Sequence, residues 1–195
     1  MTHSGKDTAE RILDAAISVI VEEGYGALSI RTVAQRASVG IGNLQHYFPT
    51  RSDLVRAALS RALEEFEVGV AARGRDQATS PEERMRVAIE VILDEQKRSG
   101  SCRLFWELWA LAAQDEQIAA AMDGFYRTYV DKVADLVGEL RPGIPRARAQ
   151  RAGAAVTSLL EGASLLRGAG KPRRRYLAGF DDTLHDVIRM IVERA

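Results

Sequence analysis

Apolar residues recur every three or four positions along almost the whole chain, which is the spacing of an amphipathic α-helix. The alternation of apolar and polar residues that marks a half-buried β-strand is absent. We therefore predict an all-α fold of about nine helices. The expected helices cover about 7–23, 29–36, 41–47, 50–74, 80–97, a segment around 103–113, 115–140, 146–167 and 175–194.

Polar residues with helix-capping ability set most of these boundaries. Asp7 followed by Glu10 resembles a capping box at the start of the first helix, and Gly24 suits its end. Ser29 is a good N-cap for the second helix. Thr50 with Asp53 three residues later predicts a second capping box, directly after Pro49 stops the preceding helix.

The same reasoning places the later boundaries. The segment Ser80-Pro81-Glu82-Glu83 combines a cap, a proline at the first helical position and acidic residues in the first turn. The helix that begins at Ser80 is expected to end before Ser99–Ser101, which breaks it. Asp115 is expected to cap a later helix.

Two short helices joined by a tight turn at 37–40, after a longer helix, form a helix-turn-helix at 29–48. The inward positions are apolar: Ile30, Val33, Ala34, Ala37, Val39 and Leu44. The outward positions of the second short helix are Gly40, Ile41, Asn43, Gln45, His46 and Tyr47. Asn and Gln side chains can make bidentate contacts to adenine in the major groove, so this helix is a candidate for reading DNA.

Charge changes this picture only locally. The chain has 27 basic and 27 acidic side chains, so its net charge is zero. Between Tyr25 and Arg61, however, the sequence contains five arginines and one aspartate. This local charge of +4 suits the binding of phosphates. The five are Arg31, Arg36, Arg51, Arg56 and Arg61. On charge alone, a solvated helix face is the favoured interpretation.

The order and spacing of five segments cover about Thr8–Leu63 without an insertion or deletion: Arg11–Ala16, Glu23–Tyr25, Thr32–Ala34, Ala37–Val39 and Gly42–Arg51. Their order and spacing resemble the tetracycline-repressor (TetR) family of transcriptional regulators. The resemblance implies a DNA-binding domain over 7–66 and an effector-binding and dimerisation domain over 80–195. It also implies DNA contacts from Arg31, Thr32, Val39, Gly40, Ile41, Gly42, Asn43, Gln45, His46, Tyr47 and Arg51.

Within that set, Tyr47 and Arg51 would hold phosphates and Gly42 would let the helix approach DNA closely. The chain departs from the family pattern at four positions. Ser38 stands where the family usually has glycine, Gly40 where it has serine or threonine, Ile41 where a basic residue is common, and Gln45 where an aromatic residue is common. These departures leave open which bases are read. Exposed helix surface is the alternative for Asn43, Gln45 and His46.

The segment Arg103–Ala113, followed by Asp115 and Tyr126–Val130, looks like the betaine-regulator type of C-terminal domain. Trp106 and Trp109 share a helix face beside Glu107, so they could bind a cationic ligand. The alternative is that both tryptophans pack a core while Glu107 pairs with Arg103. The candidate ligand-binding residues are Met85, Ile89, Trp106, Glu107, Trp109, Met122, Phe125, Tyr126, Tyr129 and Glu161.

The last two helices carry apolar residues on more than one side, which predicts a four-helix interface in a homodimer. The candidate interface residues are Gly153, Val156, Leu160, Ala163, Leu177, Phe180, Leu184, Ile188 and Ile191.

Several classes of function find no support in the sequence. No Ser/His/Asp, paired-carboxylate or metal-ligand spacing is present, so we expect neither an enzyme nor a metal or cofactor site. The lone Cys102 suits a reducing cytosol, and no segment is apolar enough to span a bilayer. We therefore expect a cytoplasmic protein that does not associate with membranes.

The resulting hypothesis is a dimeric repressor with two recognition helices about 34–36 Å apart on a pseudo-palindromic operator in double-stranded DNA. A small-molecule effector would release it by binding the non-DNA conformation more tightly. A regulator without an effector and, from another class, an all-α enzyme or small-molecule carrier are the rivals. Activation in place of repression stays open.

Overall fold

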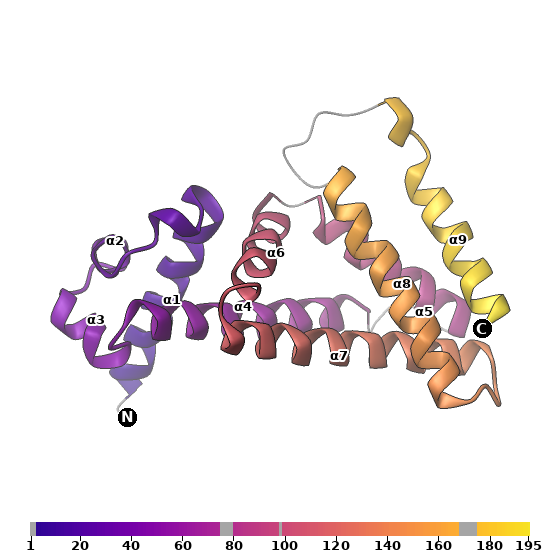
Figure 1. Cartoon of the computed structure of the whole chain (residues 1–195), viewed down its shortest axis with the longest axis horizontal. Coiled ribbons are helices and arrows are strands. Elements are labelled where there is room, and N and C mark those ends of the chain that lie inside the picture. The colour runs from indigo at the N-terminus through magenta and orange to yellow at the C-terminus, as the bar shows by residue number, and fades with distance from the viewer. Residues whose placement is uncertain (1–2, 75–79, 98, 168–174) are drawn as a thin grey trace. The chain divides into compact units, whose positions relative to one another are not determined.

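A computed structural model of the chain describes residues 3–74, 80–97, 99–167 and 175–195. Within these ranges the chain forms nine α-helices, two 3₁₀ turns and no strand, as the apolar periodicity predicts (Figure 1). The helices are α1 (His3–Glu23), α2 (Ile30–Arg36), α3 (Ile41–Tyr47), α4 (Arg51–Gly74), α5 (Pro81–Glu95), α6 (Ser99–Ala112), α7 (Glu116–Leu140), α8 (Arg146–Arg167) and α9 (Phe180–Arg194). None of the helices in the described ranges is both long and apolar enough to cross a lipid bilayer.

The chain divides into two compact units, and each is described by itself. Unit 1 comprises Met1–Phe66 and Arg103–Met122; unit 2 comprises Glu67–Cys102 and Asp123–Ala195. The first unit therefore contains more than the expected three-helix domain, because most of α6 and the start of α7 belong to it.

Unit 1 is built around a core of small and branched apolar side chains. On α6, Leu104, Leu108 and Leu111 are buried at the three- and four-residue spacing of one helix face. The buried side chains from α1 to α4 are Ile12, Ala15, Ala16, Val19, Ile20, Leu28, Val33, Ala34, Ala37, Leu44, Leu54, Val55, Ala58, Leu59, Ala62 and Leu63.

Unit 2 packs α5, α8 and α9 against the rest of α7. Gly153 of α8 lies so close to α7 that a Cβ atom added to it would be 2.7 Å from the carbonyl oxygen of Val130. In Figure 1, α8 and α9 lie side by side. The Arg167 guanidinium at the end of α8 pairs with Asp181 at the start of α9, with 2.7 Å between Nη1 and Oδ1.

Three predicted boundaries are wrong. The first helix begins at His3 instead of Asp7, because no proline stops it and the Asp7–Glu10 spacing also occurs inside a continuous helix. Ser99–Ser101 does not break a helix but begins α6, where Cys102 is buried and its thiol donates to the carbonyl oxygen of Gln96. The last predicted helix is a 3₁₀ turn at Arg175–Leu177 followed by α9, because Gly179 (φ +73°) turns the backbone between them.

Candidate functional site

The helix-turn-helix has the bounds that the sequence predicts. The Ser29 hydroxyl caps α2 by accepting from the backbone N–H of Thr32 at 3.0 Å. The turn reaches its shape through Ser38, whose φ is +54°. The glycine usual at this position in the resembled family would adopt that backbone conformation without the steric cost that a Cβ atom brings.

The α3 helix is held by one fully buried side chain, Leu44, and presents the rest of its surface outward. Gly40, Ile41, Gly42, Asn43, Gln45 and His46 are all exposed, and Val39 and Tyr47 are half-buried. Ile41 is 47 % exposed, although burial would stabilise so large an apolar side chain. The exposed amide side chains of Asn43 and Gln45 can recognise adenine edges, and the exposed Ile41 can contact thymine methyl groups.

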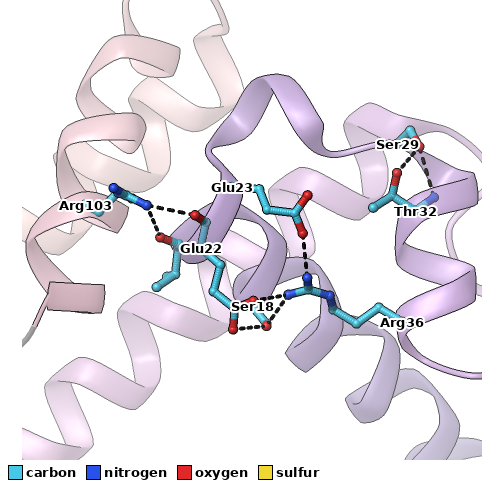
Figure 2. Close-up of polar contacts among 8 residues, drawn as sticks. Ser18, Glu22, Glu23, Ser29, Thr32, Arg36 and Arg103 are labelled. Atoms are coloured by element: carbon cyan, nitrogen blue, oxygen red, sulfur yellow. Dashed lines mark hydrogen bonds and ion pairs between the residues drawn. The ribbon is translucent and has the colours of Figure 1, made fainter.

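Arg36, one of the five arginines in the predicted basic patch, is bound by acidic side chains of α1. Figure 2 shows its guanidinium between Ser18, Glu22 and Glu23, with 2.7 Å from Nη1 to the Glu22 carboxylate and 2.5 Å from Nη2 to that of Glu23. The hydrogen bond from Arg36, with a second from Ser18, holds the pKa of Glu22 below its usual range. Arg36 therefore joins α2 to α1 and adds little net positive charge.

Arg51 at the start of α4 is a second internally bound arginine. Its Nε donates to the carbonyl oxygen of Leu28 at 2.7 Å, while Nη1 and Nη2 donate to the hydroxyl and carbonyl oxygens of Tyr25. The guanidinium carbon also lies 4.1 Å from the centre of the Tyr25 ring. Three of its five N–H groups are used in this way, which leaves two for a phosphate.

Two more arginines of the predicted +4 patch are also neutralised by acidic side chains, so the predicted local charge is too high. Arg56 pairs with Asp53 and Asp115, and Arg61 pairs with Asp14 and Glu65. Most of these acidic partners lie outside the sequence window in which the charge was counted. Among the described residues, Arg31 is the one member of the five for which no hydrogen bond or ion pair is found.

Arg103 is a contact that sequence reasoning missed. Its Nη1 lies 2.9 Å from the carbonyl oxygens of both Val21 and Glu22, in the last turn of α1 (Figure 2). These carbonyls lack partners within the helix, and a cation at a helix C-terminus is stabilising. In place of the alternative pairing with Glu107, Arg103 forms a cap that joins α6 to α1.

The two tryptophans do not share one environment. Trp109 is 51 % exposed, and Trp106 and Glu107 are half-buried. The alternative in which both tryptophans pack a core therefore does not hold for Trp109. These three residues and Met122 belong to unit 1, whereas the other candidate ligand-binding residues belong to unit 2.

Within unit 2 the structure brings four of the candidates together. The Tyr126 hydroxyl donates to Glu161 Oε2 at 3.1 Å, and the Tyr126 and Tyr129 rings are stacked, with centroids 6.4 Å apart. Phe125 is buried and meets both rings edge-on. Burial raises the pKa of the Glu161 carboxyl, and the Tyr126 hydrogen bond partly opposes that shift. A carboxylate among aromatic faces can hold a cation.

Met85 and Ile89 of α5 are buried. Met85 also lines a groove of about 660 Å³ beside α9, together with charged side chains such as Glu82, Asp182 and Arg189. This groove contains none of the aromatic candidates.

Most residues predicted for a dimer interface are instead buried within the chain. Gly153, Val156, Leu160, Ala163, Leu184 and Ile188 are all buried by the chain's own packing, so they are not available to a second copy. Leu177, Phe180 and Ile191 are half-buried. The exposed large apolar side chains of α8 and α9 are others: Leu165, Leu166 and Met190, at 61 %, 40 % and 45 % exposure.

Comparison with known proteins adds to this geometry. The sequence profile of bacterial regulatory proteins of the tetR family matches residues 12–58, and that of the C-terminal domain of BetI-type transcriptional repressors matches residues 81–193. The chain is 26 % identical over 165 residues to the HTH-type transcriptional regulator BetI of Paraburkholderia xenovorans, covering 83 % of each protein.

Solved structures of similar fold include a transcriptional regulator from Rhodococcus sp. Rha1. It has a TM-score of 0.79 and 23 % identity, with 96 % of this chain and 97 % of that one covered. A putative transcriptional regulator from Saccharomonospora viridis in complex with choline has a TM-score of 0.74 and 16 % identity, with 96 % of each chain covered.

Proposed function

Because the chain belongs to the tetR family of bacterial regulatory proteins and is a DNA-binding transcriptional regulator, we propose that it is a sequence-specific repressor released from its operator by a small molecule. The observation that carries the DNA-reading part is the α3 surface. A helix anchored by buried Leu44 presents Asn43, Gln45 and His46 to solvent, where nothing in the fold requires them.

We divide the DNA contacts by chemistry. Asn43 and Gln45 read base edges, and Ile41 and Val39 contact thymine methyl groups. Gly40 and Gly42 keep the start of α3 free of side-chain bulk, and His46 adds a polar contact. Arg31, Thr32 and Tyr47 hold phosphates, while Arg51 uses its two spare N–H groups for a phosphate.

We propose a homodimer, because a helix-turn-helix regulator reads two half-sites about one helical turn apart. The exposed side of α8 and α9 is the surface that suits a second copy. On α8 small residues precede two exposed leucines, at positions Ala154, Ala155, Ser158, Gly162, Leu165 and Leu166. On α9, Met190 is exposed and Phe180 and Ile191 are half-buried, so these three would complete the interface.

The effector site we propose lies in unit 2, at Tyr126, Tyr129 and Glu161. A fold relative of this chain is described in complex with choline, a cation, which accords with a carboxylate among aromatic rings.

A regulator whose C-terminal helices only dimerise is the second candidate. Because we propose operator DNA as the partner, we also place the protein in the cytoplasm, as a regulator and not an enzyme.

Selection from a pool of random DNA duplexes tests the proposal. We expect enrichment of a pseudo-palindrome with half-sites about 10 base pairs apart, or a multiple of that spacing. Sedimentation of the selected complex should show two chains on the site, and Leu165→Asp should yield monomers. Failure to enrich any sequence would contradict the DNA-reading assignment.

A further inference from the structure

Apart from Arg167 Nη1, which forms an ion pair with Asp181, unit 2 buries three polar atoms that have no hydrogen-bond partner among the described residues. They are Gln96 Oε1, Tyr129 Oη and Thr157 Oγ1. Gln96 and Thr157 are only 7 % and 4 % exposed. A buried polar group without a partner is unfavourable, so such groups normally have one.

The positions of these atoms relate them to the Tyr126–Glu161 pair. The Gln96 side chain donates its Nε2 to the carbonyl oxygen of Leu160 at 2.8 Å, next to Glu161 in the chain. Thr157 lies one turn before Glu161 on α8. The charge of Glu161 contributes to a raised pKa of Tyr129, after the larger effect of burial. Thr157 and Tyr129 are therefore close to the half-buried Glu161 carboxyl, and Gln96 is hydrogen-bonded to the residue that precedes Glu161.

The chemistry of the cluster specifies a ligand. Gln96 uses its NH₂ group on a carbonyl, so the atom that remains is an oxygen, which can only accept. Glu161, when ionised, also only accepts, and the stacked Tyr126 and Tyr129 rings attract positive charge. A cation that donates hydrogen bonds suits all of these groups.

We propose that this cluster binds a protonated amine that carries N–H groups, in preference to a quaternary ammonium ion, which has none. The inference rests on the proposed function, because it assigns the effector site and its ligand class. The ammonium group sits on the Glu161 carboxylate against the tyrosine rings and donates to Gln96, and the Tyr129 and Thr157 hydroxyls complete its shell.

The experiment is calorimetric titration of the full-length chain without DNA. The probes are two matched pairs: ethanolamine with choline, and benzylamine with benzyltrimethylammonium. We expect the N–H member of each pair to bind about tenfold more tightly or better, since hydrogen bonds to charged groups are the stronger ones. Equal or tighter binding of the trimethyl members would overturn the proposal, as would no binding of either N–H member at millimolar concentration.

Variants locate the site. Glu161→Gln keeps an acceptor for Tyr126 and removes the charge, so it should weaken amine binding by about tenfold or more. It should fold at least as well, because the charge it removes is one that burial disfavours. Thr157→Val removes a hydroxyl that the free protein leaves unpaired, so it should weaken binding without loss of thermal stability. Exposed Glu64→Gln is the matched control and should bind like wild type.

Unchanged amine binding by Glu161→Gln would place the ligand elsewhere. Binding to the selected operator is measured separately. A chain that binds its operator but no amine overturns this inference alone, whereas a chain that selects no DNA overturns the proposed function.

Discussion

The close contact between α7 and α8 predicts that adding one methyl group at Gly153 lowers the free energy of unfolding. A Cβ atom at Gly153 would lie 2.7 Å from the Val130 carbonyl oxygen and 3.1 Å from the backbone nitrogen of Ala134. Both neighbours are backbone atoms of a helix, so Gly153→Ala forces the helices apart, and overpacking of this kind costs about 1–3 kcal/mol. Alanine's higher helix propensity returns about 1 kcal/mol.

The matched control is Gly124→Ala on α7, where no atom lies within 4 Å of an added Cβ. It gains the same propensity without the clash, so it should be about 1 kcal/mol more stable than wild type. The propensity terms cancel between the variants, and their free energies of unfolding should differ by the packing cost, about 1–3 kcal/mol. Urea unfolding followed by circular dichroism, at one protein concentration, measures this difference.

Equal stability of the two variants would refute the close helix packing. Sedimentation adds a second distinction. If Gly153→Ala unfolds like Gly124→Ala but dissociates a dimer, then Gly153 lies between two copies of the chain, as the sequence analysis predicts. The packing within unit 2 predicts instead that Gly153→Ala is less stable than Gly124→Ala and that the dimer persists.

Three further substitutions test other contacts. Ser38→Gly relieves a φ of +54° and should raise the free energy of unfolding by about 1 kcal/mol in urea titrations; no gain would contradict the strain at this turn. Arg103→Ala removes the cap on the last turn of α1 and should cost about 1 kcal/mol in the same assay, while Arg127→Ala, which breaks an exposed pair with Asp123, should cost close to nothing. Asp53→Asn tests a pH dependence: hydrogen bonding, chiefly from the Thr50 side chain, lowers the pKa of Asp53 in the folded state, so its contribution is present at neutral pH and is lost as the pH falls below about 4. The urea midpoints of wild type and Asp53→Asn should therefore converge in acid, and a difference that stays constant with pH would show that this carboxylate has no such role.

Local signals predicted the helix boundaries best. Ser29, Ser80 and Asp115 each cap the expected helix, and Thr50 forms its capping box with Asp53, because each bond joins a side chain to backbone within three residues. The helix-turn-helix followed for the same reason. Its two helices are short, adjacent in sequence and separated by a turn that a few residues define.

The sequence does not show which residues far apart along the chain contact one another. Periodicity shows that one side of α8 is apolar, but it cannot tell whether the same chain or a second copy covers that side. Gly153 and Val156 were therefore assigned to a dimer interface and instead pack within unit 2. A charge count likewise cannot show that Arg36 meets Glu22 and Glu23 of another helix.

Among the candidate ligand-binding residues, too, the sequence does not show which residues meet over a long range. Tyr126 and Glu161 are 35 positions apart and meet because α7 and α8 pack side by side. Gln96 and Thr157 gave no signal in the sequence, since a polar residue in a helix reads as solvent-exposed until its burial is known.

Binding to the selected operator as a function of salt tests most directly whether α3 reads DNA. Fluorescence anisotropy would compare Asn43→Ala and Arg31→Ala with wild type on the selected duplex and on a scrambled one. Asn43→Ala should lose about 1–3 kcal/mol on the selected duplex and nothing on the scrambled one, because it removes a base contact. Arg31→Ala should weaken both and reduce the salt slope by about 1, because it removes a phosphate contact. If both variants bind both duplexes as wild type does, the exposed face of α3 is not the surface that meets DNA.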